Sequence, residues 1–372
     1  MKFKFVMVSL MIKNYDVLVI GGGPAGATAA RFLAQKKYSV LLVQKSFTFE
    51  KPCGGGVLLK AFDEFALDKE KILHQVNSIK FVAPSLFGVA VNLEKEPLAI
   101  VNRLEFDAYL RTLAQNEGAE IIEGYFKSYD GQHASIKSNG SELRIKSKYL
   151  IAADGVNSTV RKVLTGTLPR RVLTLYAKVE EPLTAQCEFW FGKDIAQGYY
   201  AWSFIHHKGA HIGLACEDES KAHKFFDDFC EKLGASHSPK AKGYYIPLWE
   251  DNLYRKDNIL FVGDAAGQVS PFTYEGIYYA MRSALYAVDA IVDGDLDKYK
   301  ELWQKNLKKR FKAMKLLQKL LLRWDWIIER VIKLLQNTKI HQAALRFWSG
   351  KSTPTSALQT IKKIIKLLSQ KI

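Results

Sequence analysis

The sequence predicts an α/β protein of two domains followed by a helical C-terminal extension. Three observations support this prediction. Residues 15–46 (YDVLVIGGGPAGATAARFLAQKKYSVLLVQKS) place an apolar run, a glycine-rich turn, a helical stretch and a second apolar run in succession. From about 170 to 248, apolar and aromatic residues alternate with polar ones, as in antiparallel strands. Beyond residue 298, apolar residues recur with the period of a helix.

The first of these stretches is a strand–turn–helix–strand unit. Val17–Ile20 is an apolar run too short for a helix, and it leads into Gly21-x-Gly23-x-x-Gly26. In this motif the first glycine makes the turn, the second lets the backbone meet a pyrophosphate, and the third lets helix and strand approach. The helix N-terminus then faces the anion. The unit therefore predicts a Rossmann-like dinucleotide-binding domain.

The end of the second strand departs from the usual dinucleotide-binding pattern. An acidic residue normally binds the ribose hydroxyls there, whereas this chain has Gln44. A glutamine carbonyl can still accept a hydrogen bond from a diol. We therefore expect adenosine binding to be weakened rather than lost.

The later elements return to the first domain after an excursion into the second. A helix is expected around LEFDAYLRTLAQNEG (104–118), ended by Gly118. NILFVGDAAG (258–267) repeats the strand–glycine pattern of the first unit, which indicates that the chain re-enters that domain. The predicted domains are 12–80 with 99–165 and 250–297, then 81–98 with 166–249, and a basic helical region at 298–372.

Charge and cysteine usage exclude several classes of protein. Residues 1–297 carry as many basic as acidic residues, so the whole net charge of +16 lies in the last fifth of the chain. The four cysteines are far apart and form no CxxC pair, which argues for a reducing compartment and against a zinc or iron–sulfur site. His206, His207 and His211 flank a predicted hairpin and are not expected to bind a metal.

The N-terminus does not predict export. MKFKFVMVSLMIK resembles a short signal peptide but lacks an A-x-A-like cleavage site and leads directly into a strand. Met11 is a second candidate start. No uncharged apolar run approaches 18 residues, so no membrane-spanning helix is predicted.

Four motifs together resemble the flavoprotein monooxygenases and their relatives. GGGPAG, VNRLEFDAYL, AADG and FVGDAAG occur in the order found in that group and cover about residues 14–290. The resemblance implies FAD in a fold of the glutathione reductase and hydroxybenzoate hydroxylase type. It places Arg103 at the phosphate–ribityl region, Asp264 on the ribityl chain, and Asp154 with Gly155 beside the pyrophosphate and an incoming pyridine nucleotide. Taken singly, Arg103 could be a surface ion pair, Asp154 a turn residue and Asp264 a helix N-cap.

The stretch KPCGGGV (51–57) is similar to the geranylgeranyl reductase family, whose members carry a cysteine followed by glycines beside the flavin. A planar isoalloxazine lying on the main chain requires residues without Cβ atoms, which explains Gly54, Gly55 and Gly56. Cys53 would lie where flavin and substrate meet, as a proton donor or as part of an apolar pocket. The alternative is a glycine hinge beside a buried thiol.

The stretch GYYAWSFIH (198–206) resembles the substrate-domain pattern Pro-x-x-Tyr-x-Trp-x-Phe-Pro of the same family. Tyr200, Trp202 and Phe204 match, and other residues replace both prolines. Alternate residues of a strand share a face, so the three aromatics form one wall, either of a substrate pocket or of an ordinary core. In PFTYEGI (271–277), Tyr274 replaces a small residue expected near the flavin, which would narrow the pocket.

The predicted site combines these motifs. Cys53 and Tyr200 are alternative catalytic acids, and Trp202 completes the catalytic set. No second GxGxxG unit is present, so the reductant is expected to be a transiently bound NAD(P)H or a protein electron donor. The predicted cofactor-binding residues are Gly21, Gly23, Pro24, Ala25, Gly26, Gln44, Lys45, Cys53, Gly54, Gly55, Gly56, Arg103, Asp154, Gly155, Gly263, Asp264, Gly267, Gly276 and Ile277.

The basic C-terminal region suggests an anionic membrane surface as a partner. An apolar stripe runs through it, and residues 361–372 carry a second stripe on one face. The alternative is a helical bundle packed on the first domain, and nucleic acid is not expected. The first stripe comprises Leu317, Leu320, Leu321, Trp324, Ile327, Ile328, Val331 and Leu335.

These features together predict an FAD-dependent oxidoreductase of lipid metabolism. It would be cytoplasmic, on the inner face of the cytoplasmic membrane, and reduce carbon–carbon double bonds of an isoprenoid lipid or a quinone side chain. Two rivals share its motifs: a flavin hydroxylase acting on an aromatic or quinone ring, and a non-catalytic flavin electron carrier at the membrane.

Overall fold

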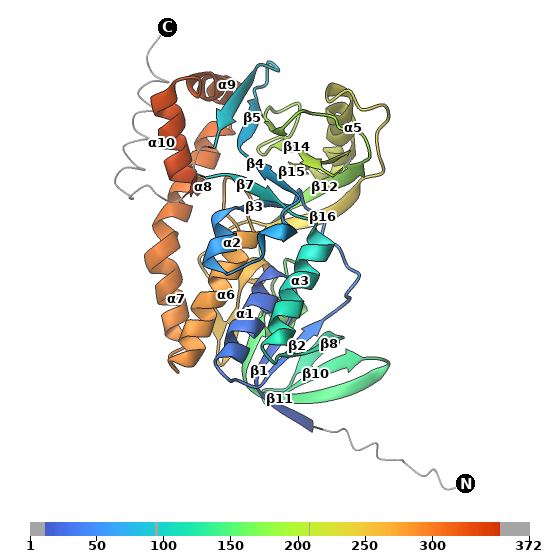
Figure 1. Ribbon diagram of the computed structural model, residues 1–372, viewed down its shortest axis with the longest axis vertical. Helices are drawn as coiled ribbons and strands as arrows, with labels where there is room; N and C mark the ends of the chain where they lie inside the picture. The colour runs from blue at the N-terminus through green and yellow to red at the C-terminus, as the bar shows by residue number, and fades with distance from the viewer. Residues whose placement is uncertain (1–11, 94–95, 208, 350–372) are drawn as a thin grey trace, which may run out of the picture.

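The computed structural model describes residues 12–93, 96–207 and 209–349. Figure 1 shows an elongated molecule with a mostly parallel sheet toward one end, a second sheet toward the other, and a column of C-terminal helices along one side. Outside the described residues lie the N-terminal segment 1–11, which includes Met11, and the second apolar stripe at 361–372.

The first sheet has the βαβ start that the glycine motif predicts. Its parallel strands pair β18–β11–β1–β2–β8, and the antiparallel β17, β9 and β10 extend it. β18 pairs with β11, so the chain returns to this sheet as expected. The strands are β1 (Ile12–Ile20), β2 (Val40–Gln44), β8 (Glu120–Glu123), β9 (Tyr125–Tyr129), β10 (His133–Ser138), β11 (Ser141–Ala152), β17 (Arg255–Lys256) and β18 (Ile259–Phe261).

Helices α1, α3 and α6 pack beside one another against this sheet (Figure 1). α1 is rich in alanine, and the turn at Gly263 packs closely against both α1 and α6: a Cβ added there would lie 3.2 Å from the Cβ of Ala25 and 3.1 Å from that of Ala280. The helices of this region are α1 (Pro24–Gln35), α2 (Lys60–Glu64), α3 (Arg103–Asn116), α4 (Thr159–Thr165) and α6 (Ile277–Val292), with short 3₁₀ turns at Lys69–Lys71 and Gly263–Ala266.

The second sheet has seven strands in the order β16–β12–β15–β14–β13–β5–β6. The predicted hairpin at 206–211 is present between β14 and β15. One pair differs from the antiparallel prediction: β13 runs parallel to β5, because β5 comes from an earlier part of the chain and not from an adjoining hairpin. The strands are β5 (Ser78–Val82), β6 (Gly88–Asn92), β12 (Arg171–Val179), β13 (Cys187–Trp190), β14 (Ala201–His206), β15 (Gly209–Cys216) and β16 (Lys242–Pro247).

A small third sheet joins the two large ones. It pairs β3 (Gly56–Leu58), β7 (Leu98–Ile100) and β4 (His74–Val76), and its first strand begins at the last glycine of the run. The helix α5 (Ala222–Lys232) and the 3₁₀ turn Glu219–Lys221 follow β15, and α5 packs against β12 and β15. The sheets do not themselves mark domain limits, so the proposed division of the chain stays a prediction.

The C-terminal extension is helical, as predicted, and its first half belongs to the core. Phe311 is fully buried, with its ring centroid 4.9 Å from Tyr279 and 5.4 Å from Trp303. The packed-bundle alternative therefore holds for α7 and α8. The elements are α7 (Asp297–Trp303), a π-helical segment (Gln304–Lys308), α8 (Lys309–Leu321), α9 (Asp325–Leu334) and α10 (Thr338–Ser349).

The apolar stripe predicted for this region is interrupted. α8 ends at Leu321, and Trp324 is the N-cap of α9. Leu320 and Trp324 are exposed, whereas Leu317 and Ile328 are buried. The prediction of a single continuous stripe was therefore wrong, because the helix axis changes direction at 322–324. None of the described helices has the length and apolarity that a membrane-spanning helix needs.

Candidate functional site

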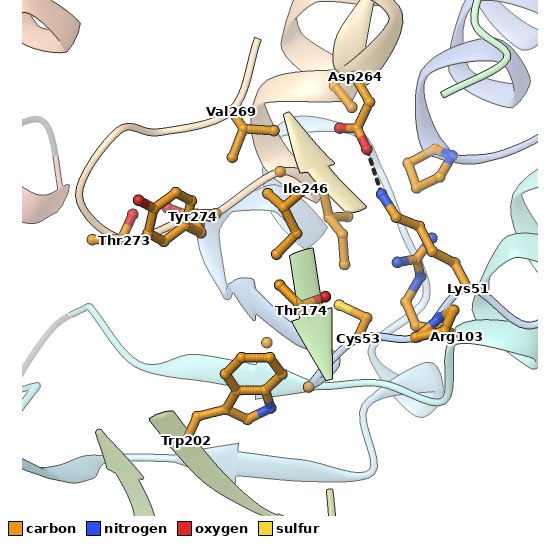
Figure 2. Close-up of a pocket in the computed structure, with 18 of the residues that line it drawn as sticks. Lys51, Cys53, Arg103, Thr174, Trp202, Ile246, Asp264, Val269, Thr273 and Tyr274 are labelled. Atoms are coloured by element: carbon orange, nitrogen blue, oxygen red, sulfur yellow. Dashed lines mark hydrogen bonds and ion pairs between the residues drawn. The ribbon is translucent and has the colours of Figure 1, made fainter. Parts of the chain in front are cut away.

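One large cavity of about 760 Å³ lies between the two large sheets and the C-terminal helices. Figure 2 shows Cys53 near its centre, between Thr174 and Arg103, with Trp202 facing it from the second sheet. The predicted site residues that line this cavity are Gly21, Gly23, Pro24, Ala25, Gln44, Lys45, Cys53, Gly54, Gly56, Arg103, Asp154, Gly155, Tyr200, Trp202, Asp264, Gly276 and Ile277. Gly26, Gly55, Gly263 and Gly267 are not among its lining residues.

The glycine loop after β1 has the geometry of a phosphate cradle. A Cβ at Gly21 (φ +101°) would lie 2.3 Å from the carbonyl oxygen of Ala153, and one at Gly26 would lie 1.8 Å from the carbonyl oxygen of Gly21. A Cβ at Gly23 would meet nothing within 4 Å and would project into the cavity. No side chain caps α1, so its first N–H groups face the space beside Gly23.

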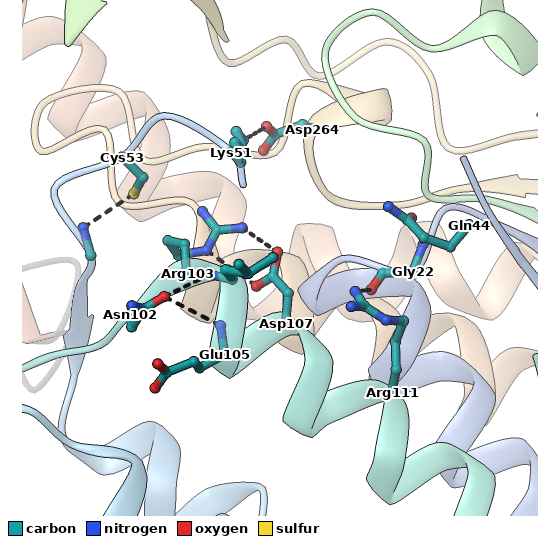
Figure 3. A network of polar contacts seen from close by, with 12 residues as sticks. Gly22, Gln44, Lys51, Cys53, Asn102, Arg103, Glu105, Asp107, Arg111 and Asp264 are labelled. Atoms are coloured by element: carbon teal, nitrogen blue, oxygen red, sulfur yellow. Dashed lines mark hydrogen bonds and ion pairs between the residues drawn. The ribbon is translucent and has the colours of Figure 1, made fainter. Parts of the chain in front are cut away.

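Gln44 binds the glycine loop itself. Its Oε1 accepts a hydrogen bond from Gly22 N at 2.7 Å, and its Nε2 donates to the carbonyl of Ser46 at 2.8 Å. Arg111 Nη1 donates to the Gly22 carbonyl at 3.1 Å (Figure 3). The carbonyl oxygen that was expected to reach a ribose diol therefore already accepts one hydrogen bond from the main chain, and its contact with a diol stays a prediction. Arg111 is a lining residue that sequence reasoning missed, since its position in an ordinary helix carries no signal.

Arg103 is buried and pairs with Asp107 one helical turn along α3. Its Nε and Nη2 donate to the two carboxylate oxygens at 3.1 and 2.8 Å (Figure 3). Burial opposes the charge, but Asp107 and the thiol of Cys53 outweigh it and raise the pKa of Arg103. The guanidinium is thus a fixed cation beside Cys53, and the surface ion pair considered from sequence is instead a buried one.

A second cation, Lys51, reaches Asp264 from the loop that precedes the glycine run. The two side chains form an ion pair that lines the cavity (Figure 2). Burial opposes the charge of Lys51, and Asp264 nevertheless raises its pKa. Gly263 N donates to Gln268 and Ser283, both at 3.0 Å, so its N–H is satisfied within the protein. Lys51 belongs to the KPCGGGV motif, two residues before Cys53. This position was the signal that could have identified it as a site residue.

Asp154 caps α4. Its carboxylate accepts hydrogen bonds from the hydroxyl of Ser158 and from Val160 N, the latter at 3.0 Å. Burial raises its pKa, and these bonds oppose that shift. Gly155 has φ +80°, and a Cβ there would meet nothing within 4 Å. Like Gly23, Gly155 therefore borders open space on the cavity side.

Protein atoms lie against the three consecutive glycines, which is a reason for the absence of side chains besides the expected flavin. A Cβ at Gly54 would lie 2.6 Å from the Phe204 ring, and one at Gly56 would lie 3.2 Å from the same ring. At Gly55 (φ +78°) it would lie 2.4 Å from the carbonyl oxygen of Val101. The Phe204 ring and the Val101 main chain therefore exclude side chains here, and contact between the glycine run and a flavin stays a prediction.

The predicted aromatic wall exists on β14. Tyr200, Trp202 and Phe204 are all buried and face the cavity. The Tyr200 hydroxyl donates to the carbonyl of Thr273 at 2.6 Å, and burial raises the pKa of Tyr200. The indole nitrogen of Trp202 is buried and has no hydrogen-bond partner. This unpaired donor lies in the cavity wall beside Gly54.

The loop before α6 contributes two further side chains. The Tyr274 hydroxyl accepts a hydrogen bond from Gln318 of α8, and its ring packs 5.8 Å from that of Tyr200. Neither carboxylate oxygen of Glu275 has a hydrogen-bond partner, and burial raises the pKa of Glu275 to about 7. Sequence reasoning missed Glu275, because a single glutamate beside Tyr274 in PFTYEGI carries no signal that it is buried.

The far end of the cavity is an apolar arm formed by the C-terminal helices. Its lining side chains come from α8, α9 and α10, and none carries a charge. They are Met314, Leu317, Leu321, Ile328, Val331, Ile332, Leu334, Leu335, Ile340, Ala344, Leu345, Phe347 and Trp348. The sequence predicted these stripes as helical faces but not that they would cover this cavity.

The residues present fit a bound FAD. The uncapped helix and the open space at Gly23 and Gly155 suit a pyrophosphate, while Arg103, Lys51 and Asp264 supply charged and polar groups further along. Within the described residues no three His, Cys, Asp or Glu side chains gather as a metal site requires. All four cysteines are free thiols.

Comparison with known proteins defines the class. Residues 14–232 match the family described as FAD binding domain. The chain belongs to this family of FAD-dependent oxidoreductases, within the part that contains the geranylgeranyl reductases.

Individual relatives place the chain more closely. It is 27% identical to geranylgeranyl diphosphate reductase of Rhodobacter capsulatus, over 94% of this chain and 95% of that protein. It is 30% identical to digeranylgeranylglycerophospholipid reductase of Methanocaldococcus jannaschii, over 73% of this chain and 75% of that one. The fold matches that of a geranylgeranyl bacteriochlorophyll reductase-like protein from Thermoplasma acidophilum with a TM-score of 0.83 at 23% identity, covering 96% and 99% of the two chains.

Proposed function

We propose that this protein saturates carbon–carbon double bonds in the prenyl chain of an isoprenoid lipid or a quinone side chain. One observation carries the proposal: a single cavity, lined also by Cys53 and Trp202, joins the glycine-lined part suited to FAD to an uncharged apolar arm. A prenyl chain suits the arm, because each CH₂ that leaves water contributes about 0.8 kcal/mol.

The residues of the chain divide the chemistry among them. Saturation adds a hydride to one carbon and a proton to the other, and reduced FAD would supply the hydride when bound. The aromatic wall of Tyr200, Trp202 and Phe204 holds the double bond in place. Covering the cavity with α8–α10 keeps water from the reacting carbons.

The proton is proposed to come from Cys53. The thiol lies beside the fixed cation of Arg103, which would balance the charge on sulfur after the proton leaves. Tyr200 is the alternative acid, but its hydroxyl proton is held by the carbonyl of Thr273. We therefore assign Tyr200 to positioning. The reductant is proposed to be NAD(P)H or a protein electron donor, which docks transiently because the chain has no second GxGxxG unit.

Anaerobic turnover tests the proposal. The full chain, loaded with FAD and reduced with dithionite, should convert a geranylgeranyl diphosphate or a geranylgeranyl-glycerol lipid into products heavier by one H₂ per bond. Cys53→Ala should lower kcat by about 100-fold, whereas Cys230→Ala, which removes a buried thiol distant from the cavity, should not. Substrate-dependent oxygen consumption with intact double bonds would instead indicate a hydroxylase. Slow turnover on every lipid tested, with function that survives both Cys53→Ala and Trp202→Ala, would indicate an electron carrier.

A further inference from the structure

Large apolar side chains are exposed together where α8 turns into α9. Trp324 and Trp326 are 52% and 54% exposed, and Leu320, near the end of α8, is 40% exposed. Single exposed apolar residues are common, but two adjacent tryptophans beside a leucine form a patch of the kind that marks an interaction surface.

The turn between β5 and β6 extends this patch. Leu86 is 53% and Phe87 37% exposed at its tip. Ser85 binds the carboxylate of Glu329 on α9, with Oγ–Oε1 at 2.7 Å, and Lys333 Nζ lies 5.8 Å from the centre of the Phe87 ring. Figure 1 shows α9 beside the β5 hairpin at one end of the molecule. We call Leu86, Phe87, Leu320, Trp324 and Trp326 the docking tip.

The charges around the docking tip are basic. Residues 309–335 contain eight Lys or Arg and two acids. Both acids are engaged within the protein: Asp325 accepts from Lys193 N at 3.0 Å, and Glu329 binds Ser85 and Lys333. The guanidinium of Arg323 lies 5.3 Å from the ring centre of Trp324. Tryptophan bordered by cations matches the headgroup region of an anionic bilayer.

The inner side of the same turn lines the apolar arm. Leu321 and Ile328 face the cavity, while their neighbours Leu320 and Trp326 face outward. The arm and the docking tip are therefore separated by a single helical layer. We propose that the docking tip binds the surface of an anionic bilayer and that the prenyl chain passes from the bilayer into the apolar arm at this place. The identity of the passing lipid rests on the proposed function; the docking itself does not.

Vesicle binding tests the docking. The FAD-loaded full chain should co-sediment with phosphatidylcholine vesicles that contain phosphatidylglycerol, and less with phosphatidylcholine alone or at high salt. The double variant Trp324→Ser/Trp326→Ser should bind about tenfold more weakly or worse. Val163→Ser, which removes a 45% exposed apolar side chain from α4, should bind as the parent does. Equal binding of the double variant and the parent overturns the proposal.

Fluorescence locates the contact. Vesicles with brominated acyl chains should quench tryptophan emission of the parent, and most of that quenching should disappear in the double variant. A parent that self-associates through the docking tip, or binds a nucleic acid there in preference to vesicles, would overturn the proposal. Matched flavin absorbance and far-UV circular dichroism of all variants show that folding is unaffected.

Two assay formats separate this inference from the proposed function. The double variant should turn over a prenyl substrate in detergent micelles as the parent does, and lose about tenfold or more with substrate in vesicles. If the double variant loses turnover equally in micelles and in vesicles, the assignment of these tryptophans to docking is overturned. Vesicle binding that depends on the docking tip, without turnover in either format, refutes the proposed function and leaves the docking supported.

Discussion

At the scale of single residues, the glycine run is constrained by protein packing as well as by the expected flavin. Gly54 lies against the Phe204 ring and Gly55 against the Val101 carbonyl, at the distances that a Cβ would not tolerate. Gly55 also has a positive φ, which a residue with a Cβ adopts at a cost of about 1 kcal/mol or more.

Substitution in this run should therefore destabilise the FAD-free protein. Gly55→Ala should lower the free energy of unfolding by about 2 kcal/mol or more, since strain and a main-chain clash add. Gly54→Ala should be partly rescued by Phe204→Leu, because its clash is with a side chain, whereas Gly55→Ala should not. Urea unfolding of the FAD-free variants measures both. If Gly55→Ala unfolds at the parent's midpoint and only loses flavin, the cofactor sets this requirement after all.

Glu275 is a buried carboxyl whose protonation is linked to stability. Burial raises its pKa to about 7, although the cations of Arg310 and Lys60 oppose that shift. The folded protein therefore binds this proton more tightly than the unfolded chain does. The stability that this group contributes is fully present below about pH 4.5 and is lost as the pH rises through about 7.

Glu275→Gln should remove this pH dependence. Relative to the variant, the parent should lose about 3 kcal/mol between pH 4.5 and 8, with no further change above that pH. Thermal unfolding across this range, at equal flavin content, measures the difference, and Glu301→Gln on exposed α7 serves as the control. A constant difference between parent and variant at every pH would contradict the shift.

At the scale of elements, the break between α8 and α9 decides what the C-terminal region does. An uninterrupted helix would present Leu317, Leu320 and Trp324 on one face. Leu317 and Leu320 both lie in α8, before the break, where Leu317 faces the cavity and Leu320 faces solvent; the break at 322–324 leaves Trp324 in solvent at the start of α9. One apolar stripe thereby supplies both a pocket lining and an exposed patch. The hydrophobic period of the sequence continues through the break, so the period alone could not reveal it.

At the scale of the whole molecule, the cavity exists only because three distant parts of the chain meet. The glycine loop, the aromatic strand β14 and α10 are separated by more than a hundred residues each, yet all line one space. If the apolar arm holds the prenyl chain, its depth should set the longest chain accepted.

Filling the arm should then shorten the preferred substrate. Ala344→Trp, on the cavity side of α10, should lower kcat/KM for a C20 prenyl chain by about tenfold or more while sparing C10, because the added ring occupies space that only the longer chain needs. Gln342→Trp adds the same ring to the exposed side of α10 and should change neither value. Equal effects on both chain lengths would place the prenyl chain elsewhere.

Local patterns in the sequence determined the nucleotide-binding unit, the two types of sheet, the helical C-terminal region and the family. Each of these depends on neighbours within a few residues, on the period of apolar positions or on a contiguous motif. Only the tertiary structure decided that Gln44 binds Gly22, that Phe204 and Val101 exclude side chains from the glycine run, and that α8–α10 cover the cavity. These contacts join segments far apart in the chain, and their geometry is set by how whole elements pack, which no local pattern specifies.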